Sequence, residues 1–192
     1  MYYVAFGPGA RHGPIGSSWG PIRSKQHILG LPNLLPRDLA KVKLGNLQMY
    51  KTADIIRCCI QFGAPCMLDN PISSMLFQAF SIAKLLKHKS CSSVTFDQCQ
   101  FGTRWRKRTR LAMWNCGDCS SLDRRCSGSA ISCSAPGKLH ISSQGSNPDG
   151  ILWTKIAQEY PAKLSHCVAH TLIESYENRL VRNTARVCGL GQ

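Results

Sequence analysis

The stretch "SSVTFDQCQFGTRWRKRTRLAMWN", residues 92–115, decides the fold. Its first seven residues are rich in β-branched and aromatic side chains, and its last seven, "TRLAMWN", are mostly apolar, so we expect a strand at each end. Between them, five of the seven positions 104–110 are Lys or Arg. Such a run either stays hydrated in an exposed loop or binds a polyanion. The sequence therefore predicts two strands joined by a cationic segment.

Helical periodicity precedes these strands. Apolar residues three and four apart predict an amphipathic helix over 38–62, with Asp38 as N-cap and an interruption at Gly45-Asn46. A short buried strand is expected at 65–68. The next helix, over 73–89, would begin at Ser73 or Ser74 and carry Phe80 on its buried face.

One or two helices are expected to follow, over 151–181, with Pro161 at a first helical position. Their buried stripe would consist of Leu164, Val168, Leu172 and Tyr176. Strands that alternate with helices predict an α/β layer architecture.

The amino-acid composition along the chain predicts its division into loop, folded part and tail. Residues 1–37 are rich in Gly and Pro and are expected to form a long loop. Residues 38–181 form the folded part, with a Cys-, Ser- and Gly-rich loop at 115–150, and 182–192 form a tail.

The charge balance points to a polyanionic partner. The chain has 24 Lys and Arg against 10 Asp and Glu, a formal net charge of +14, and no acidic residue precedes Asp38. Phosphate neutralisation with release of counterions makes DNA or RNA the simplest partner. The alternative is a basic protein whose charge serves only its solubility.

Eleven cysteines occur at irregular spacing. The sequence shows no signal peptide and no apolar run near the ~20 residues that span a membrane. We therefore expect an intracellular protein without a membrane partner, in which most thiols act as small core residues.

Five residues of the 115–150 loop have the chemistry of a zinc site. A CxxC pair is followed by two more cysteines and a histidine, and four such ligands can close a tetrahedral zinc site in a loop that lacks its own core. The candidate ligands are Cys116, Cys119, Cys126, Cys133 and His140. Buried or unordered cysteines without metal are the alternative.

Three segments carry a resemblance to a known family. They are "LDNP" (68–71), "DQCQFGTRWRKRTRLAMWN" (97–115) and "IAQEYPAKLSHCVAHTL" (156–172). Their order and spacing resemble the C-terminal half of DNA cytosine-5 methyltransferases, in particular divergent relatives in phages and mobile elements, where an "ENP" turn, a "C-x-[YF]-G…K-x-T" segment and a "YP…L" helix recur. The resemblance covers residues 38–175 in outline, and each motif by itself is weakly specific.

The resemblance implies roles for two groups of residues. Asp69 and Asn70 match the turn whose carboxylate orients the cytosine, although Asp is one methylene shorter than the family's Glu. A helix cap is the alternative role for this pair. The cationic segment would lie along DNA, with Lys107 and Thr109 at the K-x-T positions and Trp105 able to stack on a base. The remaining members of that segment are Arg104, Arg106, Arg108 and Arg110.

Several parts of such an enzyme have no counterpart in the sequence. There is no Gly-rich turn for S-adenosylmethionine and no Pro-Cys nucleophile loop ahead of the first helix, and Cys66 sits one element too late to replace it. We therefore expect a partial Rossmann-like, three-layer fold of the S-adenosylmethionine-dependent methyltransferase type with an incomplete sheet. It would bind S-adenosylmethionine only if a missing N-terminal half were supplied, and would not transfer methyl groups alone. The alternative is a non-enzymatic, basic nucleic-acid-binding module with a zinc-ordered loop.

Overall fold

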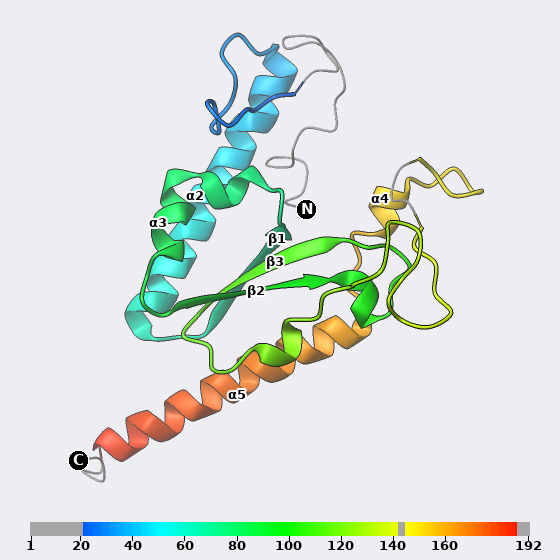
Figure 1. Ribbon diagram of the computed structural model, residues 1–192. Coiled ribbons are helices and arrows are strands. Elements are labelled where there is room, and N and C mark those ends of the chain that lie inside the picture. Colours follow the sequence, from blue (N-terminus) through cyan, green and yellow to red (C-terminus); the bar gives the residue numbers. More distant parts are fainter. Residues whose placement is uncertain (1–20, 142–144, 188–192) are drawn as a thin grey trace. The chain divides into compact units, whose positions relative to one another are not determined.

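The computed structural model describes residues 21–141 and 145–187 (Figure 1). The chain divides into two compact units: Met1–Ser92 with Ala112–Asn115, and Ser93–Leu111 with Cys116–Gln192. Much of the Gly- and Pro-rich segment expected at 1–37 lies outside the described residues, and its described part, up to residue 35, holds no helix or strand. No helix in the described ranges is both long and apolar enough to cross a membrane.

Helix α2 (Pro36–Phe62) confirms the first expected helix but begins two residues early. Pro36 occupies the first turn, where a missing N–H costs nothing. Asp38 is therefore not the N-cap; it lies inside the first turn, 3.2 Å from Lys41 Nζ. Gly63 ends the helix with a φ of +65°, a conformation that glycine adopts without strain.

The helix also continues through Gly45-Asn46, where we expected an interruption. The Asn46 side chain bonds outside the helix, accepting from Arg23 Nη1 at 2.8 Å and donating to the Leu29 carbonyl at 2.8 Å. It therefore does not compete with the helical backbone, which is the usual reason that Asn weakens a helix.

The helix expected over 73–89 is two elements. A 3₁₀ turn, η1 (Met75–Gln78), is capped by Ser74, whose hydroxyl accepts from the Leu76 N–H at 3.2 Å, and α3 (Phe80–Leu86) follows. Between them Ala79 is extended, with a ψ of 130°. The break turns the next residue outward, so Phe80 is 85% exposed and its expected burial was wrong.

Three strands form one small antiparallel sheet: β1 (Cys66–Pro71), β2 (Cys91–Asp97) and β3 (Arg108–Trp114), in the order β1-β3-β2. The two strands expected within 92–115 are confirmed, each shifted by one residue. The mixed helix-and-strand class is also confirmed. The Rossmann-like topology is not, because Rossmann sheets are mostly parallel.

The core of the first unit lies between α2 and the η1–α3 segment, which lies beside α2 in Figure 1. Met49, Ala53 and Ile56 of α2 pack in one cluster with Ile82 and Trp114. The Trp114 indole is fully buried and donates to the Leu85 carbonyl at 3.0 Å, so its polar atom is satisfied.

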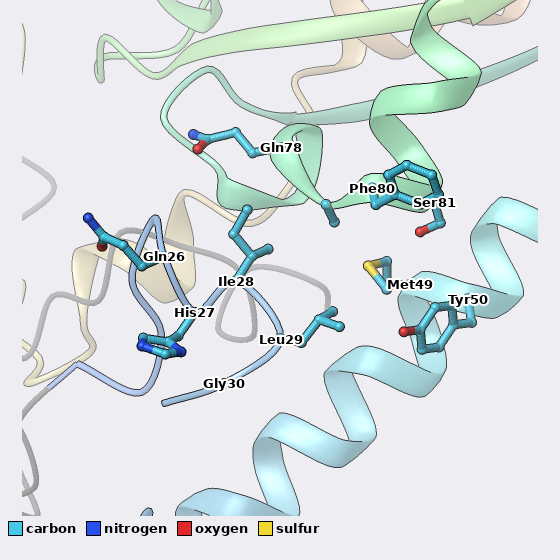
Figure 2. A pocket seen from close by; sticks show the side chains of 11 residues that line it. Gln26, His27, Ile28, Leu29, Gly30, Met49, Tyr50, Gln78, Phe80 and Ser81 are labelled. Atoms are coloured by element: carbon cyan, nitrogen blue, oxygen red, sulfur yellow. The ribbon is translucent and has the colours of Figure 1, made fainter. Parts of the chain in front are cut away.

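The same unit contains a pocket of about 530 Å³ (Figure 2). It is lined by the loop 26–30, by Met49 and Tyr50 of α2, and by residues 78–81 around the start of α3.

In the second unit, α4 (Trp153–Ile156) and α5 (Ala162–Val187) are the two expected C-terminal helices, and Pro161 directly precedes α5. Because α5 runs to Val187, the tail expected at 182–192 is mostly helical, and its last five residues lie outside the described part. Two 3₁₀ turns, η2 (Gln98–Phe101) and η3 (Ser120–Leu122), contact α5.

The buried stripe of α5 differs from the expected one. Leu164 is fully buried as predicted, but Tyr176 is 49% exposed and Ser175 is buried instead. The Ser175 hydroxyl accepts from the Gly117 N–H at 3.0 Å and donates to the Thr171 carbonyl at 2.6 Å. The loop that begins at Gly117 thus covers a polar stretch of α5, which apolar periodicity does not reveal.

Candidate metal centre and cationic segment

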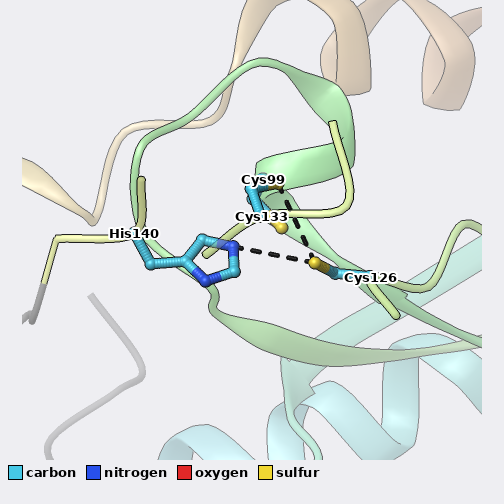
Figure 3. A group of neighbouring side chains, drawn as sticks. All are labelled: Cys99, Cys126, Cys133 and His140. Atoms are coloured by element: carbon cyan, nitrogen blue, oxygen red, sulfur yellow. Dashed lines mark hydrogen bonds between the residues drawn. The ribbon is translucent and has the colours of Figure 1, made fainter. Parts of the chain in front are cut away.

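Three cysteines and one histidine of the second unit converge: Cys99, Cys126, Cys133 and His140 (Figure 3). Their potential ligand atoms all lie within 4.8 Å of one another. Cys99 lies in η2 directly after β2, and the other three come from the loop that follows β3. Two segments far apart in the sequence therefore supply one group of ligands.

The spacing of these atoms fits a tetrahedral zinc ion. The sulfurs of Cys126 and Cys133 are 3.8 Å apart, and the Cys126 sulfur is 3.7 Å from His140 Nε2. Ligands at about 2.3 Å (sulfur) and 2.0–2.1 Å (nitrogen) from zinc, at tetrahedral angles, are separated by about 3.8 Å and 3.6 Å. Three thiolates and one imidazole are a standard structural zinc set. The cluster could hold such an ion.

The sulfurs are removed from water. Cys99 is 1% exposed, and burial raises the pKa of its thiol to about 12. Burial acts in the same direction on Cys126, but the hydroxyl and N–H of Ser134 donate to its sulfur and lower its pKa to about 6. The bonds from Ser134 thus favour the thiolate of Cys126, which is the form that binds a metal.

The carboxylate of Asp97 anchors the ligand loop to the sheet. It is fully buried at the end of β2, accepts two bonds from Arg108 at 3.0 and 2.9 Å, and accepts the Cys126 N–H at 2.8 Å. Burial alone would raise its pKa, but the bonds from Arg108 and Cys126 outweigh that effect and lower it. Asp97 is therefore ionised and fixes the position of a candidate ligand.

Much of the cationic segment 104–110 is engaged within the protein. Arg106 donates to the carbonyls of Cys126 and Gly128 at 2.7 and 2.8 Å, and Lys107 donates to the Ala157 carbonyl at 3.0 Å. The Trp105 indole donates to the Gln98 side chain at 3.0 Å. These side chains hold the ligand loop and the region before α5 against the sheet.

Other members of the segment differ in accessibility. Thr109 is fully buried, so its side chain cannot contact nucleic acid in this structure. Arg104 is exposed, the Arg108 side chain is 42% exposed beyond its pair with Asp97, and Arg110 is partly exposed, 3.5 Å from the Ser93 hydroxyl. Only part of the segment can therefore reach phosphates.

The structure corrects the predicted metal ligands. Cys126, Cys133 and His140 come together as expected, but the fourth member of the group is Cys99, and neither Cys116 nor Cys119 belongs to it. The Cys119 thiol is buried and donates to the Gly117 carbonyl at 3.2 Å, and burial raises its pKa. The prediction grouped cysteines by closeness along the chain, whereas the loop after β3 runs back to the end of β2, where the Asp97 N–H donates to the Arg124 carbonyl at 2.9 Å and the Asp97 carboxylate accepts the Cys126 N–H at 2.8 Å. The position of Cys99 directly after an expected strand was the available signal.

Asp69 and Asn70 lie near the end of β1, in the first unit, whereas the cationic segment belongs to the second. Asn70 is 4% exposed and Asp69 is half-buried. The helix-capping alternative for this pair is wrong, because Ser74 caps the helical turn that follows.

Comparisons with models of protein families, with curated proteins and with solved structures found no match for this chain. What the chain does is therefore inferred from its own residues.

Proposed function

We propose that this chain is a non-enzymatic nucleic-acid-binding module whose second unit is ordered by a Cys₃His zinc ion. The observation that carries the proposal is the convergence of Cys99, Cys126, Cys133 and His140 within 4.8 Å. The proposal replaces the CxxC-centred ligand set expected from the sequence.

Zinc would supply order that the loop lacks otherwise. In the described part of residues 115–150, the regular structure consists of the three-residue turn η3 and isolated bridges, and few apolar side chains are buried there. A structural zinc ion contributes folding free energy directly, and so can hold a segment with little core of its own.

Charge supports the nucleic-acid part of the proposal. Residues 93–141 contain eight Lys and Arg against three Asp. Five of these cations have exposed side chains, two in the cationic segment 104–110 and three in the loop after β3: Arg104, Arg108, Arg124, Arg125 and Lys138. Because the zinc site would fix the segments that carry them, metal binding and phosphate binding would be coupled. DNA is the partner that the resemblance implies.

Metal content of the tag-free protein tests the zinc ion. We expect one zinc per chain by atomic emission, and a loss of tight binding in Cys126→Ser. Cys58→Ser is the matched control, because Cys58 is an exposed thiol on α2 and should leave the zinc content unchanged. Absence of stoichiometric zinc from both the purified and the zinc-reconstituted protein would refute the site.

The salt dependence of DNA binding tests which cations bind phosphates. Removing one phosphate-binding cation should reduce the slope of log K against log salt by about 1. Arg104→Gln is expected to do so, whereas Arg57→Gln, an exposed arginine on α2 that pairs with Asp54 at 2.6 Å, is expected to change it less. Equal slopes for the wild type and Arg104→Gln would remove this residue from the interface.

The methyltransferase resemblance, with its Rossmann-like fold, remains a prediction. The described part of the chain gives no support for an S-adenosylmethionine site. Incubation with labelled S-adenosylmethionine and cytosine-containing DNA should give no incorporation. Clear incorporation would overturn the non-enzymatic assignment and leave the zinc site unaffected.

A further inference from the structure

The pocket of the first unit contains an unsatisfied polar group. Ser81 lines it, is 9% exposed, and is the one residue in the described ranges whose buried side-chain N or O has no hydrogen-bond partner. Leaving such a group unbonded costs about 1–3 kcal/mol, so an exception of this kind needs an explanation. Its oxygen has almost no accessible surface, so a ligand would reach the Ser81 hydroxyl only by shifting a neighbouring side chain, and a ligand that does so would provide this explanation.

An exposed aromatic residue, Phe80, directly precedes Ser81 and lines the same pocket. Phe80 is 85% exposed, although an aromatic side chain at that position would be expected to bury its apolar surface. Tyr50, 46% exposed, lines the same pocket from α2. In Figure 2 these rings lie with Met49 and Ser81 at one end of the pocket, and Gln26 and His27 lie at the other. Two exposed aromatic side chains at one end of the pocket suit a flat ligand.

The composition of the lining limits the ligand chemistry. None of the lining residues is Asp, Glu, Lys or Arg, although the chain is strongly basic. The polar groups are amides, a hydroxyl, a phenol and an imidazole, so the pocket has no carboxylate, ammonium or guanidinium group to pair with a charged ligand. Gln26 and Gln78 each present a donor beside an acceptor, the arrangement that pairs with the edge of a nucleobase.

We propose that this pocket binds a single unstacked nucleobase, with Phe80 stacking on the ring and the Ser81 hydroxyl bonding to a polar atom of the base. Its volume of about 530 Å³ lies within the range of about 300–1,000 Å³ usual for small-ligand sites. The site goes beyond the proposed function, because it involves neither the zinc ligands nor the cationic segment.

Titration of the full-length protein with neutral nucleosides tests the site. Adenosine, guanosine, cytidine and uridine carry no phosphate, so we expect binding of at least one of them with little dependence on salt. N-acetyltyrosinamide, an aromatic compound without a base edge, is expected to bind more weakly. Lack of binding by all four nucleosides up to their solubility, or equal binding by N-acetyltyrosinamide, would overturn the proposal.

Two variants locate the site. Phe80→Ala should weaken nucleoside binding by ~5- to 150-fold, the usual effect of losing one base–aromatic stack. Phe62→Ala is the matched control, because Phe62 is 65% exposed on α2 and does not line the pocket. Equal affinities of Phe80→Ala and the wild type would overturn the assignment.

Ser81→Ala separates a ligand-binding role from a structural one. Because the hydroxyl has no partner within the described protein, its removal should leave the thermal midpoint unchanged or raise it, while nucleoside affinity falls by ~2- to 10-fold. Unchanged affinity in this variant would overturn the role of Ser81. Failure of these titrations with zinc content and the DNA salt slope intact would refute the pocket alone, so the two proposals are tested separately.

Discussion

Replacement of Asp97 by Asn is the most informative test of how the loop that carries Cys126, Cys133 and His140 is held in place. The carboxylate is fully buried and accepts three hydrogen bonds, two from Arg108 and one from the Cys126 N–H. Asn has the same shape but only one acceptor oxygen. It can therefore satisfy Cys126 or Arg108, and it presents an NH₂ group to the other donor.

The expected loss of stability follows from these bonds. Hydrogen bonds to charged groups contribute about 1.5–3 kcal/mol each, but the Arg108 side chain is 42% exposed and regains water when its carboxylate partner is removed. We expect Asp97→Asn to lower the free energy of unfolding by about 2–3 kcal/mol. Because Asp97 orients the segment that carries Cys126, zinc affinity should also fall by about 10- to 100-fold.

Urea unfolding of the zinc-loaded protein, followed by circular dichroism, measures the loss of unfolding free energy. Competition with a chromogenic chelator measures the loss of zinc affinity. Asp54→Asn is the matched control. Asp54 pairs with Arg57 at 2.6 Å, but its side chain is 58% exposed, so the change should cost no more than about 0.5 kcal/mol. Equal unfolding midpoints for the two variants would refute the anchoring role of Asp97.

Three further results are expected. Cys99→Ser should reduce zinc affinity strongly, whereas Cys119→Ser should not, because only Cys99 belongs to the group of candidate ligands. If Cys119→Ser lost zinc and Cys99→Ser kept it, the CxxC-centred site would be restored. Removal of zinc by a chelator should increase amide hydrogen exchange in the loop 116–141 while α2 keeps its protection, since α2 belongs to the other unit; uniform loss of protection would contradict this. Arg106→Gln should weaken zinc binding and, through the loop that it holds, DNA binding as well, because this guanidinium donates to the Cys126 carbonyl at 2.7 Å; zinc affinity equal to that of the wild type would show that this bond is dispensable.

The cationic segment illustrates how one pattern can serve two purposes. Its composition suggested a surface for phosphates, and Arg104 and Arg108 retain exposed side chains. The same segment also holds the protein together, because Arg106 and Lys107 bond to carbonyls 20 and 50 residues away. Loss of DNA binding in a variant of this segment must therefore be read together with its stability.

The sequence by itself determined the local elements. Side-chain branching and periodicity placed α2, the hairpin strands within 92–115 and the helix after Pro161, because these signals act between near neighbours in the chain. The Ser- and Gly-rich loop was likewise evident from composition. Three of the four members of the candidate metal group were also expected from the sequence.

Only the tertiary structure decided which distant residues meet. The loop after β3 runs back to the end of β2, where Cys99 meets the other three candidate ligands, and Asp97 on β2 neutralises part of the cationic segment. The break at Ala79 turns Phe80 outward beside the unsatisfied Ser81, against the expectation from a continuous helix. Each of these outcomes depends on chain path and burial, which periodicity and spacing along the chain do not determine.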